Sequence, residues 1–170
     1  MKIDDHVIGR HAARVTLVEY GDYECPYCAR ANRVLQVVLT ELGDSIRYVF
    51  RNFPLPEIHP NAMNAAEAAE AVAARAGEAG FWNMHAILFE NQDALETDDL
   101  LAYAHAAGAD IETVASDLAG GARRARVERD IRLGTQQWVR GTPTFFVNGR
   151  KFDGDWTDAD GFIEMLRALW

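Results

Sequence analysis

The sequence has few cysteines, a deficit of basic residues and no long apolar run. Only two of its 170 residues are cysteine, and a chain of this length can bury a core that folds without disulfide staples. Its formal net charge of −9 argues against nucleic acid or an anionic membrane surface as a partner, because both are bound mainly through Lys and Arg. No apolar run approaches the roughly 18 residues of a membrane span. What is left is an ordinary globular composition, with 49% hydrophobic and 25% charged residues.

The N-terminal segment also lacks the apolar stretch of a signal peptide. It reads MKIDDHVIGR, and charged residues interrupt it throughout. Two neighbouring thiols in a chain without an export signal are more often catalytic or metal-binding than structural. We therefore expect a cytoplasmic protein, whereas a chain whose leader had been removed would be periplasmic or extracytoplasmic.

The apolar pattern predicts an α/β fold. Residues 15–20 (VTLVEY) and 46–50 (IRYVF) are typical of buried strands, and residues 25–42 between them carry apolar side chains at helical spacing. Such a βαβ unit has parallel strands and a right-handed crossover. The strand pattern returns at residues 143–147, and Asn148–Gly149 then favours a hairpin turn. A return strand and a last helix complete the predicted order.

The middle of the chain is predicted to be helical. Residues 62–76 are rich in Ala and Glu and predict one helix, and the pattern predicts more helices after it. We therefore divide the chain into an α/β part, residues 1–55 with 139–170, and an inserted helical domain, residues 56–138.

The last predicted helix of this block carries a run of five arginines. They are Arg123, Arg124, Arg126, Arg129 and Arg132. Acidic residues follow two of them at i+4, the spacing that places opposite charges side by side on one helix face. Because the charges are interleaved in this way, we expect a solvated helix face rather than a binding patch.

The predicted chemistry lies at Cys25 and Cys28, where a strand gives way to a helix. Pro26 fits the first helical position, where its missing N–H costs nothing. The free amides of the first turn then point toward the Cys25 sulfur and stabilise a thiolate. Because the thiolate is the nucleophile in disulfide exchange, we expect a lowered pKa for Cys25. Cys28 lies one turn on, close enough to attack a mixed disulfide.

A metal half-site is the main alternative for a Cys-x-x-Cys pair. Structural zinc takes four ligands, commonly two such pairs or one pair with two spaced histidines. The sequence has no second pair, and none of its five histidines follows the pair at that spacing. We therefore expect no metal, and no cofactor other than a redox-active Cys25–Cys28 disulfide.

The segment VEYGDYECPYC, followed more than a hundred residues later by GTPTFFVNG, resembles the bacterial DsbA-like thiol–disulfide oxidoreductases of the thioredoxin superfamily. The resemblance runs from about residue 15 to the end of the chain. It implies a thioredoxin-like fold with an inserted helical block, and protein or peptide thiols and disulfides as substrates. It also implies a redox partner or glutathione that restores the pair. A monomer is the simpler expectation.

The resemblance assigns roles to individual residues. It implies that Cys25 is the nucleophile and that Cys28 resolves the mixed disulfide. Pro143 matches a proline that is cis and faces the thiols, and the backbone of Thr142 before it would pair with the substrate. Glu19 matches a buried acid that assists proton transfer; the alternative is a carboxylate that a neighbouring Lys or Arg neutralises.

Tyr27 is a departure from the strongly oxidising members, which carry Pro-His between the cysteines. A histidine there can add positive charge beside the thiolate, and a tyrosine cannot. Cys-Pro-Tyr-Cys is usual in glutaredoxins, so we expect an intermediate reduction potential. Together with Thr142 and Pro26, Tyr27 is expected to contact substrate, and Trp138 could also flank the thiols. Two alternatives stay open: a glutathione-dependent, glutaredoxin-like reductase, and a non-catalytic binding or chaperone module on the same fold.

Overall fold

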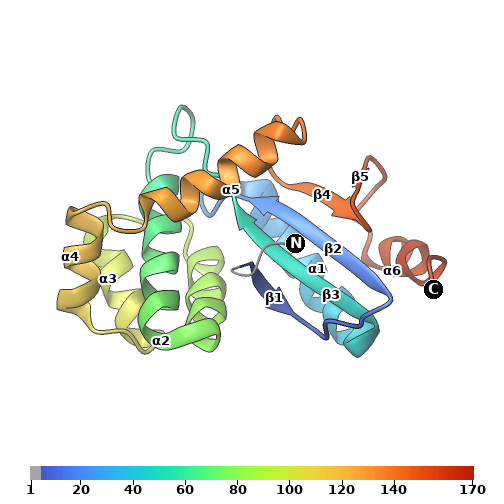
Figure 1. Ribbon diagram of the computed structural model, residues 1–170, viewed down its shortest axis with the longest axis horizontal. Coiled ribbons are helices and arrows are strands. Elements are labelled where there is room, and N and C mark those ends of the chain that lie inside the picture. The colour runs from blue at the N-terminus through green and yellow to red at the C-terminus, as the bar shows by residue number, and fades with distance from the viewer. Residues whose placement is uncertain (1–4) are drawn as a thin grey trace.

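A computed structural model describes residues 5–170 as an α/β fold (Figure 1). The strands are β1 (His6–Ile8), β2 (Val15–Gly21), β3 (Ile46–Asn52), β4 (Thr144–Val147) and β5 (Arg150–Phe152). The α-helices are α1 (Pro26–Leu42), α2 (Ala62–Glu90), α3 (Thr97–Ala106), α4 (Ile111–Ala119), α5 (Arg124–Gln136) and α6 (Ala159–Arg167). Residues 1–4 lie outside the described residues. They are the first residues of the predicted α/β part and of the segment that is expected to lack a signal peptide.

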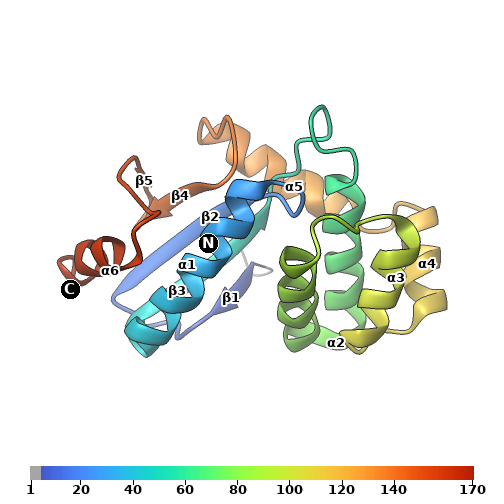
Figure 2. The same ribbon diagram turned by 180° about the vertical axis from the view of Figure 1, so that it is seen from behind.

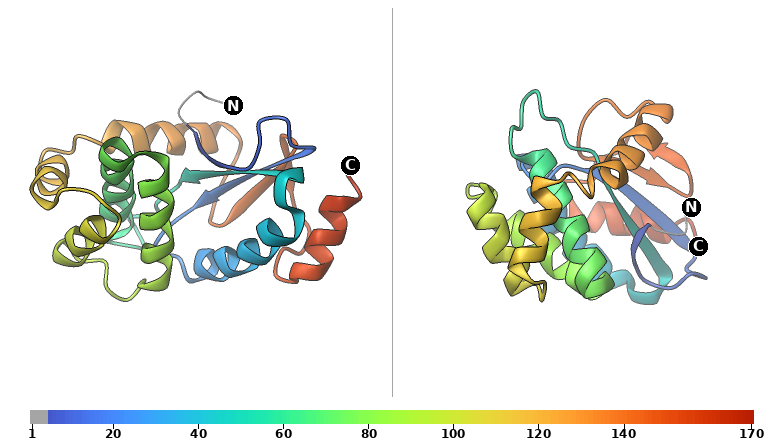
Figure 3. Two further views of the ribbon diagram at one scale, coloured as in Figure 1. Left: turned by 90° about the horizontal axis from the view of Figure 1, so that it is seen from below. Right: turned by 60° about the vertical axis from the view of Figure 1, so that its left-hand side comes forward.

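The strands form one sheet in the order β1-β3-β2-β4-β5. β2 and β3 are parallel, whereas β1, β4 and β5 each join antiparallel. The predicted βαβ unit and the late hairpin are therefore confirmed. Seen from below, α1 and α6 lie on one face of the sheet and α5 on the other (Figure 3). The central strand β2 alternates between buried and half-buried residues over residues 15–18 and is buried throughout over residues 19–21.

Four helices, α2 to α5, lie between β3 and β4 in the chain, and most of this block packs beside the sheet (Figures 1 and 2). α2 is kinked at Gly77, whose φ of 71° is a conformation that glycine adopts readily. The helix predicted at residues 62–76 is the first half of this kinked helix. One hydrophobic core includes Leu17 of β2, Leu35 of α1 and Leu100 of α3. The core thus joins the sheet to the helical block, and the domain boundaries predicted at residues 55 and 139 stay predictions.

The arginine run forms only part of the solvated face that the sequence predicts. Arg126 lies 2.7 Å from Asp130 and 3.5 Å from Glu70 of α2, and Asp130 is fully buried. Arg124 pairs with Glu67 of α2 at 3.1 Å instead of with its i+4 neighbour. The i+4 pair Arg126–Asp130 forms as predicted, and Arg124 and Arg132 are exposed. The expected solvated face is wrong for Arg126 and Asp130, because α5 packs against both β3 and α2. Its arginines therefore meet acids that are far away in the sequence, and the i+4 rule takes no account of these.

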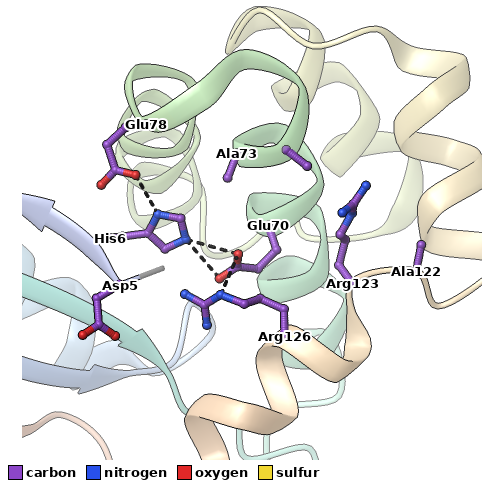
Figure 4. A pocket seen from close by; sticks show the side chains of 9 residues that line it. Asp5, His6, Glu70, Ala73, Glu78, Ala122, Arg123 and Arg126 are labelled. Atoms are coloured by element: carbon purple, nitrogen blue, oxygen red, sulfur yellow. Dashed lines mark hydrogen bonds and ion pairs between the residues drawn. The ribbon is translucent and has the colours of Figure 1, made fainter. Parts of the chain in front are cut away.

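His6 of β1 joins the sheet to α2 (Figure 4). Its Nδ1 lies 3.0 Å from Glu78, its Nε2 lies 3.2 Å from Glu70, and its ring stacks on Phe81 with centroids 3.4 Å apart. The three polar residues line a cavity of about 390 Å³ together with Arg126. Burial lowers the pKa of His6, but hydrogen bonds and charges from the two glutamates outweigh burial and raise it above 6.5.

We expect the His6→Gln variant to lose roughly 3 kcal/mol of unfolding free energy at pH 5.5, because it breaks a buried ion pair. The folded-state pKa of His6 is raised, so its contribution is complete below the unfolded value near 6.5 and is lost as pH rises through the folded value. Urea unfolding at pH 5.5 and 8.5 measures both effects. The control is His105→Gln, at an exposed position on α3. A deficit that grows with pH would contradict the assignment.

Candidate active site

Cys25 is the N-cap of α1, and Pro26 is its first helical residue. Extended backbone at Cys25, with φ of −76° and ψ of 121°, turns the chain from the end of β2 into the helix. The Cys25 side chain is only 4% exposed, and its Sγ lies 3.4 Å from the carbonyl oxygen of Thr142. The thiol therefore lies at the start of a helix, where unpaired amides favour negative charge.

The pKa of Cys25 is lowered to about 5. A hydrogen bond from the Cys28 thiol is the main cause, and burial acts against it. A side-chain hydrogen bond with Thr142 and the backbone amides of Cys28 and Tyr27 lower the pKa further. The direction is the one that the helix start predicts, and it makes Cys25 mainly a thiolate at neutral pH.

Cys28 has the opposite character. It is fully buried, and its Sγ accepts a hydrogen bond from the backbone N–H of Asp22 at 3.4 Å. Burial raises its pKa well above the ordinary value, and the hydrogen bond to Cys25 and the charges of Glu19 and Cys25 add to this. Both cysteines are free thiols. The pair therefore combines a reactive sulfur with a protected one.

Glu19 lies on β2 and is buried with no charged partner beside it among the contacts that the structure describes. Its Oε2 accepts a hydrogen bond of 2.6 Å from the Tyr48 hydroxyl, and Oε1 has no hydrogen-bond partner within the described residues. Burial raises the pKa of Glu19 to about 8; the Tyr48 hydrogen bond lowers it, and the charge of Cys25 raises it. A carboxyl group with this pKa can take up and release a proton near neutral pH.

Pro143 follows a cis peptide bond, Thr142–Pro143, as the resemblance implies. The bond places the Thr142 carbonyl against Cys25 Sγ, which brings the start of β4 to the thiols. Pro26 and Tyr27 are exposed beside them, Tyr27 by 64%. Substrate contacts at these two residues and at Thr142 stay predictions.

Three residues that hold the active-site loop were not found by sequence reasoning. The buried Asp22 carboxylate accepts hydrogen bonds from the backbone of Leu55 and from His59, at 2.9 and 2.8 Å. Gln92, between α2 and α3, donates to the carbonyls of Tyr23 and Cys25, at 2.8 and 2.9 Å. Asp22 lies in the segment VEYGDYECPYC, which is a weak indication that it belongs to the site. The sequence gives no such indication for His59 and Gln92, because they are far from residues 22–25 along the chain and contact them only in the folded structure.

Known proteins resemble this chain in sequence and in fold. A family model described as Thioredoxin matches residues 2–165. Oxidised BdbD from Bacillus subtilis is similar with a TM-score of 0.85 and 27% identity, covering 97% of this chain and 92% of that one. A thioredoxin-like oxidoreductase from Silicibacter pomeroyi DSS-3 is similar with a TM-score of 0.77 and 25% identity, covering 98% and 94%. The thiol-disulfide exchange protein alpha-DsbA2 from Wolbachia pipientis shares the fold at 19% identity and a TM-score of 0.82, with 99% and 89% covered.

The curated relatives of the chain are named as Na(+)/H(+) antiporters. A Na(+)/H(+) antiporter NhaA 1 of Mycolicibacterium vanbaalenii is 43% identical over 166 residues, covering 96% of this chain and 26% of the antiporter. The NhaA 1 antiporter of Salinispora arenicola is 45% identical over 165 residues, covering 96% and 24%. The chain thus spans about a quarter of the length of these relatives. Among residues 5–170, no helix is both long and apolar enough to cross a membrane.

Proposed function

The chain belongs to the thioredoxin family as a DsbA-like member, and on that premise we propose that it exchanges disulfides with protein or peptide thiols through Cys25 and Cys28. The difference between the two thiols is the observation that carries the proposal. The pKa of Cys25 is lowered to about 5 at a helix start, whereas burial keeps Cys28 protonated. The Cys25 thiolate is the proposed attacking group, and the protonated Cys28 thiol, one helical turn away, is the proposed group that resolves the mixed disulfide.

The proposed exchange has two steps. The Cys25 thiolate attacks a substrate disulfide, forms a mixed disulfide and releases the other substrate sulfur as a thiolate. Cys28 then gives up its proton and attacks the Cys25 sulfur, which forms the Cys25–Cys28 disulfide and releases the second substrate sulfur. The substrate is reduced and the pair oxidised; the reverse sequence oxidises a substrate dithiol. Glu19 is the proposed proton acceptor for Cys28. The two thiols carry the electrons, so the reaction needs no further cofactor.

The direction depends on the reduction potential. A stabilised Cys25 thiolate favours the reduced pair and so makes the disulfide an oxidant, while Tyr27 adds no charge beside it. We expect a potential of roughly −200 to −230 mV, measured as the redox equilibrium of the pair against glutathione. A value near thioredoxin's, about −270 mV, would make the protein a reductant. If no Cys25–Cys28 disulfide forms at any glutathione ratio, the proposed function is wrong. The measured potential of the Cys25–Cys28 pair also tests the predicted cytoplasmic location, when it is compared with the redox potential of the cytoplasm.

The antiporter relatives favour a second candidate function for the same thiols. A unit that matches about a quarter of each of these proteins could exchange disulfides with an antiporter rather than with many proteins. The proposed chemistry is unchanged, and only the substrate differs. Identifying the protein held in a mixed disulfide with Cys25 separates the two candidates.

A further inference from the structure

Trp138 occupies a backbone position that normally selects glycine. Its φ is 61°, in the left-handed region. The residue follows the C-cap of α5, Gln137, where its N–H donates to the Thr135 carbonyl and the next N–H, of Val139, donates to Gly134. These two bonds define a helix-ending motif whose left-handed residue is usually glycine, since a side chain strains that conformation. The helix end therefore gains nothing from a tryptophan.

Burial does not compensate for the strain. The Trp138 side chain is 72% exposed, more than any other large apolar side chain that the structure describes. Its contact with Arg140, whose guanidinium lies 5.4 Å from the ring centroid, is a weak one at an exposed site. The apolar contact of the motif comes instead from Val139, which is buried. A strained and exposed aromatic residue with no role in folding points to a role in function.

The position of Trp138 indicates what that role is. The residue stands on the segment that leads to Thr142, whose carbonyl contacts Cys25 Sγ. Trp138 and Thr142 are four positions apart in the chain, so the backbone keeps their Cα atoms within about 14 Å of each other. The start of α1, next to Cys25, exposes 64% of Tyr27. Trp138 and Tyr27 are thus exposed aromatic residues on the two segments that meet where Cys25 Sγ contacts the Thr142 carbonyl.

We propose that Trp138 binds substrate, as an aromatic platform for an apolar or aromatic side chain next to the reacting cysteine of a polypeptide. The inference rests on the proposed function, because the platform has this use only if Cys25 reacts with polypeptide sulfur. A rigid indole offers a large contact area at low conformational cost. Its role is selection among substrates, and the exchange chemistry stays with the two thiols.

The test uses two disulfide peptides that differ only beside the cysteine, with leucine and tryptophan in one and serines in the other. Trp138→Gly is expected to lower the ratio of kcat/KM for the apolar peptide to that for the serine peptide by about 10-fold, through a higher KM. Because glycine relieves the left-handed strain, the Tm of the variant should not fall, and a rise of about 2 °C is expected. Trp138→Phe keeps a ring and should restore most of the ratio.

The control is Trp170→Ala, because Trp170 is also an exposed tryptophan under an arginine, with Arg14 5.8 Å from its ring centroid. It should leave the ratio unchanged. An unchanged ratio in Trp138→Gly, or an equal loss on both peptides, would overturn the inference, as would a Tm several degrees lower. A wild-type protein that reduces or oxidises neither peptide would instead refute the proposed function.

Discussion

Replacing Cys25 with serine is expected to lower the rate of disulfide exchange at least about 1,000-fold, because a serine hydroxyl is not ionised at neutral pH and cannot replace the thiolate. Replacing Cys28 with serine has a different result: Cys25 still attacks, but no thiol resolves the product, and the mixed disulfide accumulates. Mass spectrometry of the protein after reaction with a disulfide peptide measures both outcomes. One adduct on Cys25 is expected in Cys28→Ser and none in Cys25→Ser.

Alkylation of the reduced wild-type protein gives the matched control. Its rate should follow a thiolate whose pKa is about 5, with Cys25 modified first and the buried Cys28 protected until the protein unfolds. A reactivity that rises only near pH 8.5, the ordinary value for a free thiol, would contradict the effect assigned to the helix start. If alkylation modified Cys28 first, Cys28 would be the attacking thiol and Cys25 the resolving one.

The species trapped by Cys28→Ser also separates the functions that the sequence left open. Many unrelated proteins held in mixed disulfides support the proposed oxidoreductase, and glutathione alone supports a glutaredoxin-like reductase. An antiporter held on its own supports the second candidate function. A Cys25→Ser variant with full biological function would instead favour a binding module in which the thiols are incidental.

The parts of the site that the sequence predicted are those whose cause is local in the chain. The helix start at Cys25 follows from the order strand, cysteine, proline and apolar helix. Glu19 and Pro143 were assigned through the resemblance, by their places in the segments VEYGDYECPYC and GTPTFFVNG. Each signal lies within a few residues of the feature it predicts, and the parallel pairing of β2 and β3 follows from one short crossover.

The contacts that were missed join residues far apart in the sequence. Tyr48 reaches Glu19 from the neighbouring strand, 29 positions away, and Gln92 reaches the Cys25 carbonyl across 67 positions. Opposite charges at i+4 predicted exposed pairs for the arginines of α5; Arg126 does pair with Asp130, but Asp130 is fully buried, and Arg124 pairs with Glu67 of α2. Trp138 was noticed only as an aromatic residue that could flank the thiols, because its left-handed backbone has no signal in composition. Periodicity predicts which face is buried, but not which polar partners meet there.

Replacing Glu19 with glutamine is expected to slow the resolving step about 100-fold at pH 8.5, where Glu19 is mainly ionised and can accept the Cys28 proton; general bases contribute 10²–10⁴-fold. Attack by Cys25 should be nearly unchanged below pH 8, since Glu19 is then mainly protonated and glutamine resembles its neutral form. Stopped-flow measurement of the decay of the mixed disulfide separates the two steps. A loss confined to the attack step would contradict the assigned role.

The same variant is expected to be more stable than the wild type at high pH. The folded-state pKa of Glu19 is about 8 against an ordinary 4.5, so between these values the folded protein keeps a proton that the unfolded chain loses. Wild-type stability therefore falls as pH rises from about 4.5 to 8, by about 1.4 kcal/mol for each unit of pKa shift. Glutamine does not titrate, so the free-energy difference between the variants should grow over that range and then level off, reaching several kcal/mol.

Urea unfolding of the reduced proteins at pH 5, 7 and 9 measures this difference, and Tyr48→Phe is the matched variant. The Tyr48 hydrogen bond lowers the pKa of Glu19, so its loss should raise that pKa further and extend the fall in stability to higher pH. A glutamine variant that is less stable than the wild type at pH 9 would show that ionised Glu19 has a stabilising partner. An acid that costs stability where it ionises, and speeds resolution by Cys28, is kept for its chemistry rather than for the fold.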